Sequence, residues 1–116
     1  MKIWIEKELF QWEKDRYVCL EFSNNEPQID NVQFYNSKDL EGQVVPLKNQ
    51  RAKIPNYLLK ESLPIMAVAC VGSEGDTKVI GRKSFRVLKR ARPEFYYEEP
   101  EDSITKEIIY DGGEEV

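Results

Sequence analysis

The residue types that carry most enzymatic chemistry are missing or poorly spaced in this chain of 116 residues. Histidine is absent, which removes the commonest general base, the usual partner of a nucleophilic serine or cysteine, and the commonest metal ligand. Cys19 and Cys70 are too far apart in sequence to form the close pair of a cysteine-rich zinc site. Gly112 and Gly113 are not followed by lysine with serine or threonine, so no phosphate-binding loop is predicted. We expect a non-enzymatic protein with no catalytic, cofactor or metal site.

Carboxylates are abundant toward the C-terminus, and a pair such as Glu99 and Asp102 could in principle act as acid and base or bind calcium. Spacing alone is weak support, because clustered acids near proline are typical of solvated linkers. Residues 91–116 hold nine acids and two bases, a net charge of −7, whereas residues 1–90 hold 12 acids and 15 bases, a net charge of +3. The sequence therefore predicts a mildly basic body followed by an acidic C-terminal arm.

A basic stretch precedes this arm and is the strongest charge signal in the body. It contains seven bases and no acid: Lys78, Arg82, Lys83, Arg86, Lys89, Arg90 and Arg92. Such a stretch could follow a phosphate backbone, be the charged outward face of a strand, or dock an acidic surface such as the arm of a neighbouring copy. An acidic chain binds nucleic acid poorly, so we expect no nucleic-acid partner. Arg82, Arg86 and Arg90 are the candidate partner-binding residues of this stretch.

Apolar and polar residues alternate in several short runs, which predicts half-buried strands. Turn residues separate these runs, and one helical turn is expected over residues 55–59, where proline fits the first position. We expect Val79, Phe85 and Val87 in the core. The pattern predicts an all-β fold, a single immunoglobulin-like antiparallel β-sandwich over residues 1–90 with about seven strands. The expected strands cover residues 3–5, 16–22, 31–35, 42–45, 51–54, 65–71 and 78–88.

Both cysteines lie in apolar runs, where free cysteine behaves as a small hydrophobe. The alternative is an inter-sheet disulfide, but Trp4 and Trp12 both precede Cys19, so the order of antibody domains is missing. The longest apolar run, residues 63–71, has about half the length of a membrane-spanning helix, and we expect no membrane partner. The N-terminus lacks the pattern of a secretory signal peptide, which favours synthesis in a cytoplasm.

The arm carries two groups of candidate contact residues. Phe95, Tyr96 and Tyr97 are good interface anchors if the arm is extended, or they fold back onto the body. In the second group, Ile104, Ile108 and Tyr110 could add as a strand to another subunit. We expect residues 1–90 to fold by themselves and residues 91–116 to act as an assembly arm.

Two regions together resemble a known family. The run AKIPNYLLKESLPI at residues 52–65 and the later segments Phe85-Arg86-Val87 and RARPEFYYEE, residues 90–99, are similar to the first domain of tail, baseplate and fibre proteins from phages and prophages of Gram-positive bacteria. The resemblance spans roughly residues 1–100. It implies a β-sandwich that closes with a basic, proline-containing, aromatic linker.

The resemblance also implies a virion structural protein, synthesised in the host cytoplasm, whose partners are other virion proteins and copies of itself. Larger family members continue into further domains after the linker, so the place of this chain in the tail, baseplate, neck or head stays open. Two other classes are compatible with the residues. One is a small β-barrel that binds single-stranded nucleic acid, and the other is an acidic inhibitor of a host enzyme.

Overall fold

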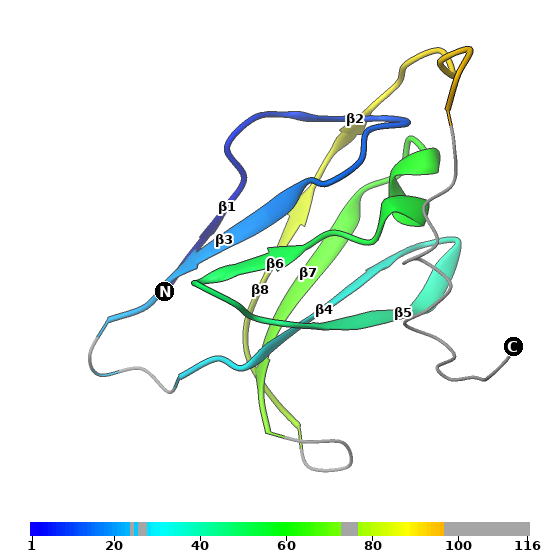
Figure 1. The fold of residues 1–116 in the computed structure, drawn as a ribbon. Helices are drawn as coiled ribbons and strands as arrows, with labels where there is room; N and C mark the ends of the chain where they lie inside the picture. Colours follow the sequence, from blue (N-terminus) through cyan, green and yellow to red (C-terminus); the bar gives the residue numbers. More distant parts are fainter. Residues whose placement is uncertain (24, 26–27, 73–76, 97–116) are drawn as a thin grey trace, which may run out of the picture.

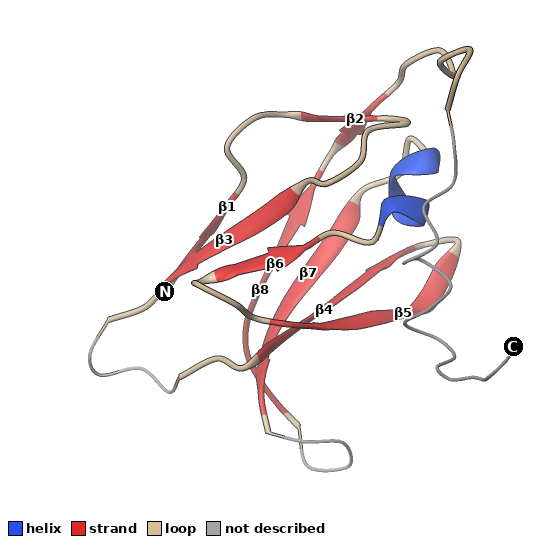
Figure 2. Ribbon diagram, viewed as in Figure 1, coloured by secondary structure: helices blue, strands red, loops and turns tan. Residues whose placement is uncertain are grey.

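The computed structural model describes residues 1–23, 25, 28–72 and 77–96, and strands dominate this part of the chain (Figures 1 and 2). Within the described residues, the single helical element is a short 3-10 helix directly after Pro55, which confirms the expected helical turn. The elements are β1 (Lys2–Trp4), β2 (Leu9–Phe10), β3 (Tyr17–Glu21), β4 (Asn31–Asn36), β5 (Asp39–Pro46), β6 (Arg51–Lys53), η1 (Asn56–Lys60), β7 (Ile65–Val71), β8 (Lys78–Phe85) and β9 (Val87–Leu88).

The strands form two antiparallel sheets and one small parallel pair. The first sheet has the order β1-β3-β6, the second has the order β5-β4-β7-β8, and β2 pairs in parallel with β9. All neighbours within the two larger sheets run antiparallel. The predicted all-β fold is therefore confirmed, while the immunoglobulin-like sandwich stays a prediction.

One hydrophobic core receives side chains from both larger sheets. Val18 and Leu20 of β3 belong to it together with Phe34 of β4 and Ile65 and Ala67 of β7. Successive side chains of a strand point to opposite faces, so the alternation seen in the sequence selects these residues for burial. Fully burying a side chain of this kind contributes roughly 1.5–3 kcal/mol, which makes this core the main source of stability.

The last long strand differs from its prediction at Val79. Phe85 and Val87 are buried at 6% and 5% exposure, as expected, but Val79 is 62% exposed. Opposite β8, the register shifts between Ala69, which pairs with Gly81, and Cys70, which pairs with Val79. This bulge inserts one extra residue, Ile80, into β8. The side chains on either side of the bulge therefore exchange faces of the sheet, and Ile80 packs against the core in place of Val79.

Polar side chains fix the turn between β4 and β5. The buried Asn36 side chain accepts hydrogen bonds from the backbone N–H groups of Lys38 and Asp39, at 3.0 and 2.9 Å. Asp39 Oδ1 in turn accepts from the N–H of Gly42 at 3.2 Å. Gly42 has a φ of 61°, a left-handed conformation that glycine adopts without steric cost. Residues 36–39 thus form one of the turns expected between the strands.

Both cysteines are buried and unbridged in the structure. Leu20 and Ala69, their neighbours in β3 and β7, point into the core. Adjacent strand residues face opposite sides, so Cys19 and Cys70 lie on the outer faces of two different sheets. The core separates the two thiols, which explains why no disulfide joins them.

The pairing of β2 with β9 was missed by the sequence analysis. Leu9 lies opposite Val87 and Phe10 opposite Leu88, which brings the N-terminal segment beside the end of the described chain. The pair is too short to show an alternating pattern. It positions the loop that follows β2 against residues 89–96, where the candidate surface lies (Figure 1).

Candidate interaction surface

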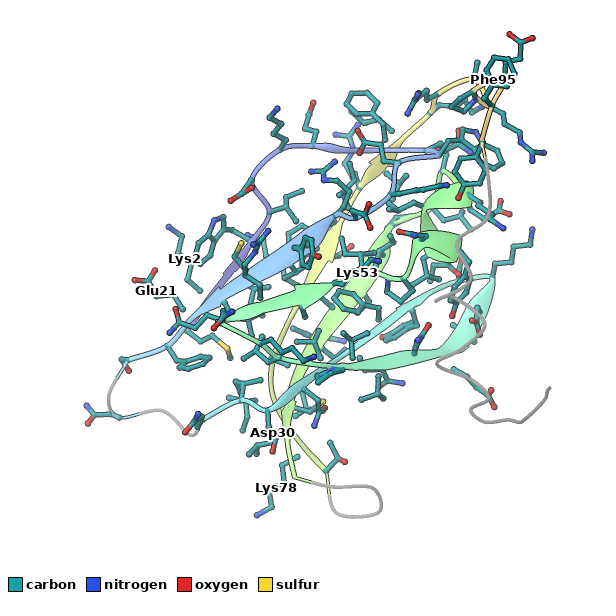
Figure 3. The ribbon with its side chains drawn as sticks, in the orientation of Figure 1. Lys2, Glu21, Asp30, Lys53, Lys78 and Phe95 are labelled. Atoms are coloured by element: carbon teal, nitrogen blue, oxygen red, sulfur yellow. The ribbon has the colours of Figure 1, made fainter. Side chains whose placement is uncertain are left out.

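The seven bases of the basic stretch are all exposed, and the stretch begins on an edge of the four-stranded sheet. Its first three bases, Lys78, Arg82 and Lys83, lie on β8, an end strand of that sheet, and the other four follow β8 in the sequence. Lys78 at one end of the stretch and Phe95 just beyond the other end lie at opposite ends of the molecule (Figure 3). Arg82 and Arg86 are therefore accessible to a partner. Phe85 lies in the core, so its ring does not contribute to this surface.

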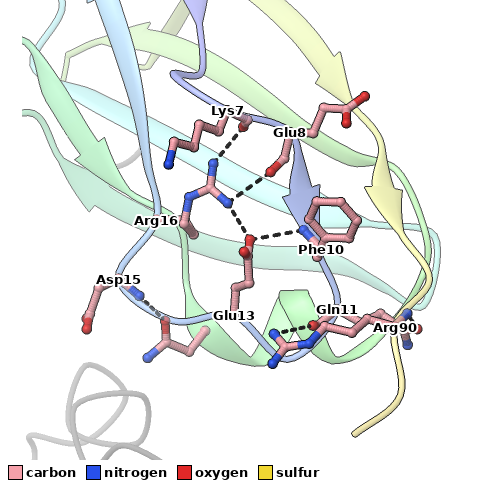
Figure 4. A network of polar contacts seen from close by, with 9 residues as sticks. Lys7, Glu8, Phe10, Gln11, Glu13, Asp15, Arg16 and Arg90 are labelled. Carbon is pink, nitrogen blue, oxygen red and sulfur yellow. Dashed lines mark hydrogen bonds and ion pairs between the residues drawn. The ribbon is translucent and has the colours of Figure 1, made fainter. Parts of the chain in front are cut away.

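Arg90 is exposed but has a structural role in addition. Its backbone N–H donates to Gln11 Oε1 at 3.0 Å, and its guanidinium donates to the Gln11 carbonyl at 3.4 Å (Figure 4). Gln11 Nε2 donates to the carbonyl of Lys60 at 2.9 Å. These bonds join the end of β9, the loop after β2 and the end of η1. Of the three predicted arginines, Arg90 is thus the one that holds the linker to the body.

The predicted aromatic cluster is divided in the structure. Tyr96 packs against Trp12, and its ring lies 4.6 Å from Lys14 Nζ and 5.8 Å from the Arg92 guanidinium. Phe95 points outward and is 73% exposed. The alternatives of an extended and a folded-back cluster are therefore each correct for one residue. Tyr97, Ile104, Ile108 and Tyr110 lie outside the described residues, as does most of the predicted arm.

The loop that carries Trp12 is held by a polar network centred on Arg16 (Figure 4). The Arg16 guanidinium donates to the carbonyls of Lys7 and Glu8, at 2.6 and 3.0 Å, and forms an ion pair with the Glu13 carboxylate. The same Glu13 oxygen accepts from the Phe10 N–H at 3.0 Å. Charge-assisted bonds of this kind are stronger than neutral ones, so the loop is a firm support for Trp12.

The sequence analysis missed Gln11, Trp12 and Lys14, which contact the linker residues Arg90, Arg92 and Tyr96. Trp12 has a left-handed φ of 70°, and its backbone N–H donates to the Leu59 carbonyl at 2.8 Å. The aromatic partner of Trp12, Tyr96, is distant in sequence, so the contact itself could not be read from local pattern.

The described residues contain no group of three or more potential ligands, among histidine, cysteine, aspartate and glutamate, that could hold a metal ion. Nor does this part of the chain contain a helix that is long and apolar enough to cross a membrane. Burial raises the pKa of the Cys70 thiol, and the nearby Asp30 carboxylate raises it further. A raised pKa keeps the thiol protonated, which makes it a poor nucleophile.

In comparisons with known proteins, no family model, curated protein or solved structure matches this chain.

Proposed function

We propose that this chain is a structural component of a phage particle, an assembly module that acts through protein–protein contacts. The observation that carries the proposal is the cationic edge of β8, which continues through β9 into a linker anchored on the body at Tyr96. Such an edge suits an acidic protein surface. The three bases on β8 are not interleaved with exposed aromatic rings, which single-stranded nucleic acid would need for base stacking, because Phe85 of that strand is buried.

The strand orders support an immunoglobulin-like sandwich as the framework. The order β1-β3-β6 corresponds to strands A, B and E of that fold, and β5-β4-β7-β8 corresponds to C′, C, F and G. Cys19 and Cys70 fall on the strands equivalent to B and F. Their side chains lie on outer faces, so the domain would be a variant without the inter-sheet disulfide.

The two regions that resemble the phage family meet in space. Ile65, at the end of the first region, pairs with Phe85 at the start of the second. Ser62 Oγ donates to the Val87 carbonyl at 2.9 Å. Segments that are separate in the sequence thus form one structural unit next to the linker.

The first experiment tests where the protein resides. Phage particles from the producing strain are purified by density gradient, and their proteins are identified by mass spectrometry. We expect the chain at a fixed number of copies per particle, and immunogold labelling should place it on the tail, baseplate, neck or head. Gradient-purified particles that lack the chain while the lysate contains it would overturn the proposal.

The second experiment tests the surface. The double variant Arg82→Glu, Arg86→Glu should fold normally and lose most incorporation into particles, because charge reversal places like charges across the contact. Lys7→Glu is the matched control, since Lys7 is also exposed but lies outside the basic stretch. Equal incorporation of the double variant and the control would show that the basic stretch at Arg82 and Arg86 is not the contact surface.

A further inference from the structure

A second cationic site lies away from β8, where the chain passes from β5 to β6. A pocket of about 390 Å³ opens there, and its lining includes Tyr17, Pro46 and three bases, Lys48, Arg51 and Lys53. None of the described acidic residues lines it. The pocket volume lies within the range of about 300–1,000 Å³ that ligand sites occupy. The pocket borders β5, which is the opposite end of the four-stranded sheet from β8.

Backbone geometry places the three bases on one face. Lys48 and Arg51 lie opposite each other and exchange two backbone hydrogen bonds of 2.9 Å. Asn49 and Gln50 close this two-residue turn with left-handed φ values of 53° and 62°, the pattern of a tight hairpin turn. Lys53 follows Arg51 by two positions along β6, so their side chains share a face of the strand.

Neighbouring groups orient two of these bases in advance. The Arg51 guanidinium lies 4.3 Å from the centre of the Tyr17 ring, and Tyr17 is the residue opposite Lys53 in β3. Lys53 Nζ contacts Asp15 Oδ1 at 3.1 Å, and the Lys53 side chain is about a quarter exposed. A guanidinium stacked on a ring keeps its planar fork of donors, which matches the two oxygens of a carboxylate.

We propose that this pocket binds carboxylate groups of an acidic polypeptide, and that its occupant is the segment 97–116 of a second copy of the chain. That segment holds eight acids and one base, a net charge of −7, which complements a pocket lined by three bases, of which Asp15 offsets only Lys53. This inference rests on the proposed assembly function and names the partner of one contact. The β8 surface and the pocket then serve two different contacts, since they lie on opposite edges of the sheet.

A charge exchange between full-length chains tests the proposal. The pocket variant carries Arg51→Glu and Lys53→Glu, and the tail variant carries Glu98→Lys, Glu99→Lys and Glu101→Lys. Sedimentation equilibrium of each variant alone should show self-association weakened by roughly tenfold or more relative to the unmodified chain. An equimolar mixture should regain association, because each variant supplies the complement of the other. Far-ultraviolet circular dichroism and thermal unfolding verify that each variant folds.

Two further measurements sharpen the result. Arg51→Lys keeps the charge and removes the fork, so we expect association weakened several-fold and less than in the pocket variant. Lys7→Glu is the control and should associate like the unmodified chain. Titration of the full chain with inorganic phosphate separates a general oxyanion site from a carboxylate site. Chloride at equal ionic strength is the control for this titration. If millimolar phosphate displaces the second copy and chloride does not, the pocket is a general oxyanion site and the assigned occupant is wrong.

The remaining outcomes distinguish this inference from the proposed function. If the pocket variant self-associates as strongly as the unmodified chain, the pocket assignment is wrong, although incorporation into particles can still hold. If the unmodified chain is monomeric, or if the mixture of variants does not regain self-association, no second copy fills the pocket. Either result also overturns the inference. Loss of incorporation in the Arg82 and Arg86 variant is independent of all three results.

Discussion

The Tyr96 ring packs edge-on against the Trp12 ring, with centroids 5.3 Å apart and planes at 72°. Trp12 sits on the loop that Arg16 and Gln11 hold, so the contact connects residues 91–96 to the body. The predicted boundary near residue 91 was placed where the composition changes. The described linker nevertheless contacts the body, and the division into body and arm stays a prediction.

Replacing Tyr96 by leucine should lower the free energy of unfolding by about 1 kcal/mol, because edge-on aromatic pairs contribute about 0.5–1.5 kcal/mol beyond their buried area. Urea denaturation followed by far-ultraviolet circular dichroism measures this change. Phe95→Leu is the matched control and should leave stability unaltered, since Phe95 is 73% exposed. If the two leucine variants are equally stable, Tyr96 does not pack on Trp12 in solution.

The alternation of apolar and polar residues predicts the strands of this fold but not the register between them. The strands around Val18, Phe34 and Ile65 follow from alternation, because one face of each is buried and the other is not. The position of Val79 could not be predicted, since the bulge that turns it outward depends on the register with β7. A single sequence contains no information on that register.

The candidate surfaces were predictable to different degrees. The basic stretch was visible because seven bases and no acid fall within the 15 residues from Lys78 to Arg92. Lys48, Arg51 and Lys53 are interrupted by polar and apolar residues, and only the turn at Asn49 brings them to one face. Contacts between distant segments, such as that of Trp12 with Tyr96, follow from topology alone and leave no mark in local composition.

Two glycines should respond differently to substitution by alanine. At Gly42, a Cβ atom would lie 1.8 Å from the Phe34 carbonyl oxygen, and φ is 61°. At Gly81, a Cβ atom would lie 2.5 Å from Cε of Met1, the end of a flexible side chain that can move aside. We expect Gly42→Ala to cost at least about 2 kcal/mol and Gly81→Ala less than about 1 kcal/mol. Thermal and urea unfolding compare the pair, and similar losses would contradict the conformation assigned to Gly42.

Asn56 is fully buried, and its Oδ1 atom accepts a hydrogen bond from the Asp15 N–H at 3.1 Å. Asp15 has a left-handed φ of 57°, so this bond fixes a turn that aspartate adopts less readily than glycine. Asn56→Ala should lower the free energy of unfolding by about 1–3 kcal/mol, because it leaves a backbone donor without its acceptor. Asn49→Gly, at an exposed left-handed position, should change stability by no more than a few tenths of a kcal/mol in the same urea assay. A neutral Asn56→Ala variant would exclude this role.

Cys70 gives the protein a predictable response to alkaline pH. Burial and the Asp30 carboxylate raise the pKa of its thiol in the folded state. Below the ordinary thiol pKa of about 8.5, both the folded and unfolded chains keep the proton, and the contribution of the thiol is fully present. Above that pH the unfolded chain ionises first. The free energy of unfolding should therefore fall as the pH rises toward and through the folded-state pKa.

The comparison of the unmodified chain with Cys70→Val isolates this effect from the titration of tyrosine and lysine. Urea unfolding between pH 7 and pH 10.5, under reducing conditions, should show a steeper loss of stability in the unmodified chain, because valine fills the same buried site without an ionisable group.

Alkylation of the two cysteines tests the same property of Cys70 independently. In denaturant without reductant, intact mass should show two labels per chain, one for each free cysteine. In the folded protein Cys70 should react slowly even at pH 8, since the thiol is buried and the thiolate is disfavoured. Equal slopes for the two proteins, or rapid labelling of folded Cys70, would show that the thiol is solvated and that its pKa is not raised.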